Sequence, residues 1–295
     1  MAGQLRVVRR RIRSVQSTMR ITRAQELIAA SRVVKAQQRV EAARPYTTEM
    51  TRALTNVANT EVTLSHPLLE QRPDRSAAAV LVVTSDRGLA GPYNANVLRL
   101  TEELLARLRA DGMEPRLFVA GRKGIAYYRF RQRPVADSWL GFSESPSYDH
   151  AKEAADRMLE AFLDHEVDEI HAVYTDFVSA VTQRTVARRF IPLVVEERRE
   201  RPPHPIPMYL FEPGAQEVLG ALLPRYIEAR VFTAMLEAAA SEHAARRKAM
   251  SAATDNAEEL IEDLTREYNQ ARQAEITQEI MEIVGGAEAL QKTGS

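Results

Sequence analysis

Cysteine is absent from the 295-residue sequence. Its absence excludes disulfide bonds, thiolate catalysis, thiolate metal ligands and redox control by thiols, and it fits a reducing compartment. Net charge is absent as well, because 40 Lys and Arg balance 40 Asp and Glu, so overall charge predicts neither nucleic acid nor an acidic surface as partner. No run approaches the ~20 apolar residues of a membrane span, and the N-terminus lacks the apolar core of a signal peptide, so we interpret it as mature protein.

Glycine and proline are missing from two long stretches, one between Gly3 and Pro45 and one between Pro224 and Gly285. Both stretches therefore predict long helices. In the first, apolar residues recur at the 3-4 spacing of a heptad seam, with a charged interruption at Glu26. The seam consists of Leu5, Val8, Ile12, Val15, Met19, Thr22, Glu26, Ala29, Val33, Ala36, Val40 and Ala43. A seam of this length predicts a partner helix, and the spacing of Met50 and Leu54 indicates that helix resumes after Pro45, with room for a kink.

Small residues dominate the seam of the C-terminal stretch. Alanine at such positions lets two helix axes approach closely and favours helix intrinsically, which predicts a thin, stiff rod. At about 1.5 Å per residue, a helix from 216 to 288 would be on the order of 105 Å long and would project from a compact domain. The seam consists of Ile227, Val231, Ala234, Ala238, Ser241, Ala245, Met250, Ala253, Ala257, Ile261, Leu264, Tyr268 and Ala271.

The two ends carry opposite charge, +9 over residues 1–44 and −5 over residues 225–295. If both helices leave the central domain at one level and pair antiparallel, opposed residue numbers add up to about 276. This register places Arg9, Arg10, Arg11 and Arg13 opposite Glu262, Asp263 and Glu267. The first helix would then end opposite about residue 273.

The apolar stripe of the C-terminal helix changes phase between Ala271 and Ile276. It continues as Ile276, Ile280, Ile283, Val284 and Ala287. Because the shift falls where the partner helix should end, we expect a single helix there that needs an outside partner or socket.

The middle of the chain alternates between strand and helix patterns, which is typical of a small doubly wound α/β sheet. Expected strands are 78–84, 116–120, 169–175 and 191–197, with a possible edge strand at 208–211; expected helices are 94–110, 123–130 and 148–164, and 200–207 is a proline-rich loop. The fold class is thus α+α/β: a long antiparallel coiled coil of the terminal helices plus a Rossmann-like domain. The expected domains are 1–58 and 216–290 for the helices and 77–212 for the α/β foot.

Two glycine-containing turns follow strands, Ser85–Gly91 and Gly121–Gly124, where a phosphate loop could sit. Neither matches GxGxxG or GxxxxGK[ST], so we interpret both as structural turns. The six histidines lack metal-ligand spacing and form no local catalytic set, which leaves no catalytic, cofactor-binding or metal site to predict. The arginine-rich first helix could lie on DNA, but its heptad seam and its acidic partner within the chain argue against nucleic acid.

Several segments together resemble the gamma subunit of F-type ATP synthase, in its order and spacing and over the whole chain. They are 10–15, 21–24, 29–31, 41–46, 85–89, 253–257, 271–280 and 282–287. The resemblance implies a central rotor shaft that turns with a membrane c-ring, driven by proton flow, inside an alpha3-beta3 hexamer and beside epsilon. It implies no catalysis and no cofactor in this chain, no membrane insertion, and a peripheral location on the cytoplasmic side of the cell membrane.

The resemblance also implies contacts with the beta subunits. Arg272, Gln273 and Thr277 would meet a catch loop, with Glu279 and Glu282 nearby, and Arg23, Gln25 and Arg246 match positions near the beta lever. Gln25 departs from the methionine of the family pattern and Ala90 from a cysteine, and a regulatory dithiol insert is missing. A nucleotide-binding α/β enzyme and a generic coiled-coil scaffold stay open as alternatives.

Overall fold

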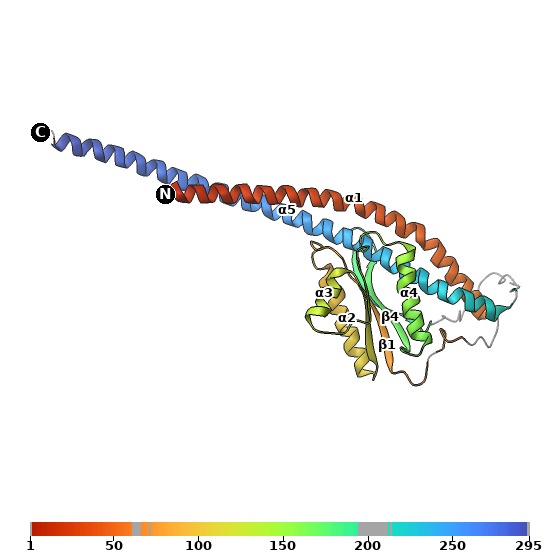
Figure 1. The fold of residues 1–295 in the computed structure, drawn as a ribbon. Coiled ribbons are helices and arrows are strands. Elements are labelled where there is room, and N and C mark those ends of the chain that lie inside the picture. The colour runs from red at the N-terminus through yellow and green to blue at the C-terminus, as the bar shows by residue number, and fades with distance from the viewer. Residues whose placement is uncertain (1, 61–65, 71, 194–211, 213, 294–295) are drawn as a thin grey trace. The chain divides into compact units, whose positions relative to one another are not determined.

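A computed structural model describes residues 2–60, 66–70, 72–193, 212 and 214–293 (Figure 1). The chain divides into two compact units. One consists of residues 1–28 and 247–295, and the other of residues 29–246. Each unit is described by itself below.

Two long helices contribute to both units. Helix α1 spans Ala2–Thr60 and helix α5 spans Ala215–Thr293. Both continue through a proline, Pro45 in α1 and Pro224 in α5, so helix does resume after Pro45 as the apolar spacing predicts. The other elements are β1 (Ala77–Val83), α2 (Tyr93–Ala110), β2 (Glu114–Ala120), α3 (Arg122–Phe130), β3 (Asp137–Trp139), α4 (Tyr148–Leu163), β4 (Glu169–Phe177) and β5 (Gln183–Ile191).

The unit of residues 29–246 contains a five-stranded sheet in the order β3-β2-β1-β4-β5. The first four strands in this order are parallel, and β5 pairs antiparallel with β4. The chain therefore winds outward from β1 in both directions, which confirms the predicted doubly wound domain.

Helices cover both faces of this sheet (Figure 1). Alternate residues of β1 point to opposite faces: Ala79 and Leu81 join a core with α4 and the first turns of α5, and Val80 and Val82 join a core with α2 and α3. Every residue of β1 is buried. A strand buried on both faces explains why its sequence is an unbroken apolar run.

Most predicted strands and helices of the domain agree with the structure to within two residues at each end. The strand predicted at 191–197 is wrong in position, since β5 begins at Gln183 and ends at Ile191, and β3 was not predicted. Strand β5 carries Arg184, Arg188 and Arg189, so it lacks the apolar run of a buried strand, and β3 is too short to show a period. The predicted loop at 200–207 and edge strand at 208–211 lie outside the described residues.

Candidate functional site: the paired terminal helices

The unit of residues 1–28 and 247–295 is a pair of helix segments lying side by side (Figure 1). Its buried residues are few and mostly small or medium-sized: Val8, Thr22, Met250, Thr254, Ala257 and Leu264. The other predicted seam positions whose burial is described in this unit are half-buried. The predicted seam is therefore confirmed, and small residues keep the pair thin.

Hydrogen bonds across the pair fix its register. The hydroxyl of Thr254 donates to the hydroxyl of Thr22 at 2.9 Å, and the two residue numbers add up to 276. Near the start of α1, Arg9 donates to the hydroxyl of Tyr268, and its guanidinium lies over the tyrosine ring. These two contacts confirm an antiparallel pair in the predicted register.

The basic and acidic segments lie opposite one another in the predicted register, but within the described parts of the chain they form few direct ion pairs. Among the described residues, no ion pair within 4.0 Å joins Arg10, Arg11 or Arg13 to the acidic side chains of α5. Asp263 pairs with Arg266 on its own helix instead. The basic and acidic segments do lie opposite one another, but their side chains are exposed, so solvent screens the attraction and no specific contact forms.

Helix α5 changes character after residue 275. Glu275 is the last half-buried residue, and every residue from Ile276 to Gly285 is exposed. The exposed fraction is 43% for Ile276, 54% for Ile280, 72% for Ile283 and 51% for Val284. At about 100° per residue, this stripe is rotated by roughly 120° from the seam. The predicted phase change is confirmed, and an apolar stripe lies beyond the paired region; Ala287 lies outside the residues whose side chains are described.

The five contact residues predicted on this segment are all exposed: Arg272, Gln273, Thr277, Glu279 and Glu282. Helical spacing places Gln273 within the apolar stripe and Arg272 and Thr277 along its borders. Glu282 lies on the opposite side of the helix from the stripe. The hydroxyl of Thr277 donates to the carbonyl of Gln273 at 2.9 Å, so it is satisfied without a partner protein.

The two contact residues predicted on α1 lie within the paired region. The side chain of Arg23 is exposed and forms an ion pair with Glu26 at 3.1 Å. Gln25 is half-buried. Arg23 is therefore held along its own helix and remains accessible to solvent.

Arg246, the eighth predicted contact residue, belongs to the other unit and is only 5% exposed. Its guanidinium forms ion pairs with Glu242 at 2.6 Å and Glu144 at 3.3 Å, and it donates to the carbonyl of Gly88 at 3.3 Å. Burial raises the pKa of Glu242 to about 7, against the lowering effect of Arg246. Arg246 thus ties α5 to two loops of the α/β domain.

Glu144 is the centre of this network and was not among the predicted residues. Its carboxylate also pairs with Arg32 of α1 and with Arg87 at 3.5 Å. In the sequence, only the spacing of four residues between Glu242 and Arg246 indicated an ion pair of this network. Glu144, in a loop, gave no such signal.

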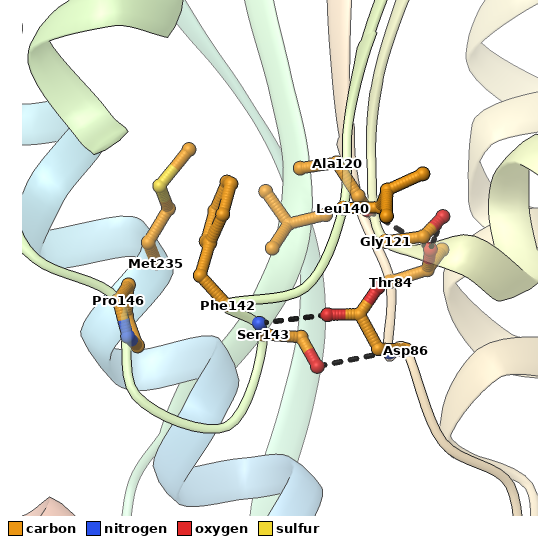
Figure 2. Close-up of a pocket in the computed structure, with 10 residues that line it drawn as sticks. Thr84, Asp86, Ala120, Gly121, Leu140, Phe142, Ser143, Pro146 and Met235 are labelled. Carbon is orange, nitrogen blue, oxygen red and sulfur yellow. Dashed lines mark hydrogen bonds between the residues drawn. The ribbon is translucent and has the colours of Figure 1, made fainter.

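The carboxyl end of the sheet, where a nucleotide would bind in a doubly wound domain, is filled by the protein itself. Asp86 accepts hydrogen bonds from the backbone amides of Arg122 at 3.0 Å, Gly141 at 2.8 Å and Ser143 at 3.0 Å. Figure 2 shows the bond from Ser143. The hydroxyl of Ser143 also accepts a hydrogen bond from the backbone amide of Asp86 at 2.9 Å. The Asp86 carboxylate therefore already accepts the hydrogen bonds from the backbone amides that a phosphate would need.

The turn at Gly121 closes the same corner. Its φ is +102°, and a Cβ there would lie 2.2 Å from the carbonyl oxygen of Thr84, so only glycine fits. The cavity beside Asp86 has a volume of about 10 Å³, close to the minimum that holds one water molecule. These observations support the interpretation of Ser85–Gly91 and Gly121–Gly124 as structural turns.

The described parts of the chain offer neither a metal site nor a membrane span. No cluster of three or more His, Asp or Glu there could hold a metal ion. Nor does any described helix combine the length and apolarity needed to cross a bilayer.

The sequence of this chain matches known proteins over nearly its whole length. The family model described as ATP synthase matches residues 4–290. The ATP synthase gamma chain of Acidothermus cellulolyticus is 61% identical, with all of both chains covered. This chain belongs to the ATP synthase gamma chain family. The gamma chain of Frankia casuarinae is 58% identical and covers 98% of this chain and 99% of its own.

Solved structures of this family share the fold. A chain of the Euglena gracilis mitochondrial ATP synthase, in a structure of OSCP, F1 and c-ring, has a TM-score of 0.68 at 19% identity, covering 100% of this chain and 97% of its own. A chain of the Tetrahymena thermophila mitochondrial central stalk and c-ring has a TM-score of 0.58 at 21% identity, covering 79% and 99%. At such identities the likeness shows the fold alone.

Proposed function

We propose that this chain is the central rotor shaft of a proton-translocating F-type ATP synthase. It couples rotation of the membrane c-ring to sequential conformational changes of the catalytic beta subunits. Its partners are the alpha3-beta3 hexamer, epsilon and the c-ring, and the complex places it peripherally on the cytoplasmic side of the cell membrane. The single observation that carries this proposal is the apolar stripe of α5 beyond the helix pair, in a chain of the gamma family.

The stripe supports the proposal for a physical reason. Ile276, Ile280, Ile283 and Val284 leave apolar surface in water, at about 25 cal/mol per Å², unless a partner covers it. A socket of apolar side chains would bind this surface yet let it turn, because apolar contacts have no preferred direction. Arg272, Gln273 and Thr277 border or join the stripe, and Glu279 and Glu282 follow on the same segment; we propose these five as contacts of a beta-subunit loop.

The proposal assigns no chemistry to this chain. Asp86 fills the amides at the carboxyl end of the sheet, and the cavity there is too small for a nucleotide. ATP is therefore made or hydrolysed by the partners. Arg23 and Gln25 are proposed to face the beta lever, whereas Arg246 would act from within the chain, holding the loops of the α/β domain to α5.

Deletion of residues 274–295 tests the rotor against a passive scaffold. The complex is reconstituted with alpha and beta subunits, and its torque is measured from the rotation of an attached bead. We expect torque to fall, because the deletion removes the apolar stripe while the seam up to Ala271 remains. A control that ends after Gly285 keeps all four apolar side chains of the stripe and should retain more torque than the longer deletion.

Unchanged torque after the longer deletion would favour a scaffold. The isolated chain offers a separate test of the enzyme alternative. We expect it neither to hydrolyse ATP nor to bind ATP tightly. Robust ATPase activity of the purified chain alone would contradict the proposal.

A further inference from the structure

Two carboxyl groups meet inside the unit of residues 29–246, where α5 crosses the end of β4. Asp176 is the next-to-last residue of β4 and is 8% exposed. Glu237 lies on α5, where its half-buried carboxyl faces Asp176. An ionised carboxylate can only accept hydrogen bonds, so two carboxylates can bond only if one of them carries a proton.

The two oxygens of Asp176 differ in their surroundings. Oδ2 accepts from the guanidinium of Arg188 on β5. Oδ1 is buried and has no hydrogen-bond partner among the described residues. A buried acceptor without a donor costs free energy, and a protonated Glu237 is the donor that would satisfy it.

Neighbouring contacts hold Glu237 in this position. One turn further along α5, Ser241 donates to the carbonyl of Thr175 at 3.1 Å, so this face of the helix meets the end of β4 directly. One turn earlier, Thr233 hydrogen-bonds Thr47 of α1 at 3.0 Å. The backbone of α5 at Glu237 therefore lies between two turns that are anchored beside the end of β4 and to α1.

We propose that Asp176 and Glu237 share one proton and so form a proton-binding site that fastens α5 to the end of β4. Arg188 pairs with Asp176, and in this proposal the shared proton lies on Glu237. Arg44 of α1 is the other charged group near Glu237, and Tyr174 of β4 also faces the pair but stays neutral because burial raises its pKa. When the proton leaves, two like charges face each other in a largely buried place, and this contact loosens.

Burial first, and then Asp176, raises the pKa of Glu237 from 4.5 to about 7, while Arg188 and Arg44 lower it. The folded chain therefore holds this proton at pH values at which the unfolded chain has lost it. The stabilisation is greatest below about pH 4.5, falls as pH rises and is lost once pH passes about 7. The junction of α5 with β4 should thus respond to pH in the neutral range.

Hydrogen exchange of the full-length chain tests this site. Protection factors, corrected for the intrinsic rate at each pH, are compared at pH 5.5 and pH 8.5 for peptides covering residues 172–178 and 233–241. We expect the wild-type protection to fall by up to about 30-fold on going to the higher pH, because pH 5.5 lies about 1.5 pH units below the folded pKa of Glu237. Glu237→Gln should lose most of this change, since its amide donates to Oδ1 of Asp176 at both values.

Two further variants make the result specific. Glu258→Gln, on an exposed face of the same helix, should keep the wild-type pH dependence. Asp176→Asn should lose most of it, and it serves if Glu237→Gln does not fold. Carboxyl ¹³C resonances of a glutamate-labelled chain should show two groups titrating near pH 7, Glu237 and Glu242, and only the resonance of Glu237 should be missing in Glu237→Gln.

Three results would overturn the proposal. The first is wild-type protection that is equal at both pH values. The second is an unchanged pH dependence in Glu237→Gln. The third is protection restored at pH 8.5 by Mg²⁺ or Ca²⁺ in the wild type but not in Glu237→Gln, because the pair would then hold a cation and not a proton.

Discussion

Helix α5 passes through two different environments along its length. Between Leu219 and Arg246 only two residues, Ala221 and Arg225, are exposed, so the helix is buried on nearly every side. Between residues 247 and 275 four residues are buried, three to seven positions apart. The same secondary structure thus serves as a core element in one unit and as one half of a thin pair in the other.

This difference suggests that one unit stabilises the fold and the other offers surface for contact with partners. The largest fully buried side chains, among them Phe118, Tyr128 and Phe162, belong to the unit of residues 29–246. The terminal pair buries little, and it exposes apolar residues such as Val7 and Ile21. We infer that the larger unit holds most of the folding free energy, whereas the pair keeps its faces available for partners.

Phe162→Ala should have the largest effect. Phe162 is fully buried between α4 and the sheet, and truncating such a side chain costs about 3–5 kcal/mol. Urea denaturation should show this loss in the unfolding of the larger unit. Phe130→Ala is the matched control, because Phe130 is 88% exposed and its truncation should change stability little.

Asp168 predicts an acid-sensitive step in the same unit. Burial acts to raise its pKa, but hydrogen bonds from Ser76, Arg72 and Ala77 outweigh burial and lower it. This stabilisation is present above the ordinary pKa of 3.8 and is lost as pH falls through the lower folded value. Asp168→Asn should cost about 2–4 kcal/mol at pH 7.

The acid titration supplies the contrast. The variant should lose less stability than the wild type between pH 5 and pH 2, as followed by thermal melting. Asp164→Asn, at an exposed carboxylate four residues earlier, should behave as the wild type does. If Asp168→Asn and the wild type lost equal stability between pH 5 and pH 2, Asp168 would not be the cause of the acid sensitivity of this unit.

Thr254→Val should have a smaller effect, confined to the terminal pair. It removes the bond to Thr22, which is worth about 1 kcal/mol. A double-mutant cycle with Thr22→Val, monitored by hydrogen exchange of residues 5–28, should show that the two threonines stabilise the pair jointly, with a favourable coupling energy. Thr265→Val is the control, since Thr265 is exposed and bonds only to Ile261 of its own helix among the described residues. Zero coupling would contradict the register.

Charge reversal at Arg10 and Arg13 should have the smallest effect. Both side chains are exposed, and the acidic residues opposite make no close pair with them among the described residues. We expect a loss of about 0.3 kcal/mol that vanishes at high salt. A loss above about 1 kcal/mol, unchanged by salt, would mean that specific ion pairs hold the terminal helices together.

Periodicity made the helix pair predictable from sequence. A seam of small and apolar residues fixes which face is buried, and the ends of the two helices fix the register that Thr22 and Thr254 display. The apolar run of β1 was equally clear. The position of strand β5 was predicted wrongly because an edge strand with arginines on its exposed face resembles a loop in sequence.

Tertiary polar networks were not predictable in the same way. Glu144 meets Arg32, Arg87 and Arg246 only because three distant segments fold together. The proximity of Asp176 to Glu237 likewise depends on how α5 crosses β4. No local pattern encodes such contacts, so sequence placed Arg246 among the surface residues of a helix although it is buried.

Rotation of a single molecule tests the central claim most directly. The chain has no cysteine, so Phe130→Cys in the exposed end of α3 gives one attachment point for a bead. With the complex fixed through its beta subunits and supplied with ATP, the account predicts unidirectional rotation of the bead in three steps per turn. A bead that stays still while the same complex hydrolyses ATP would contradict it.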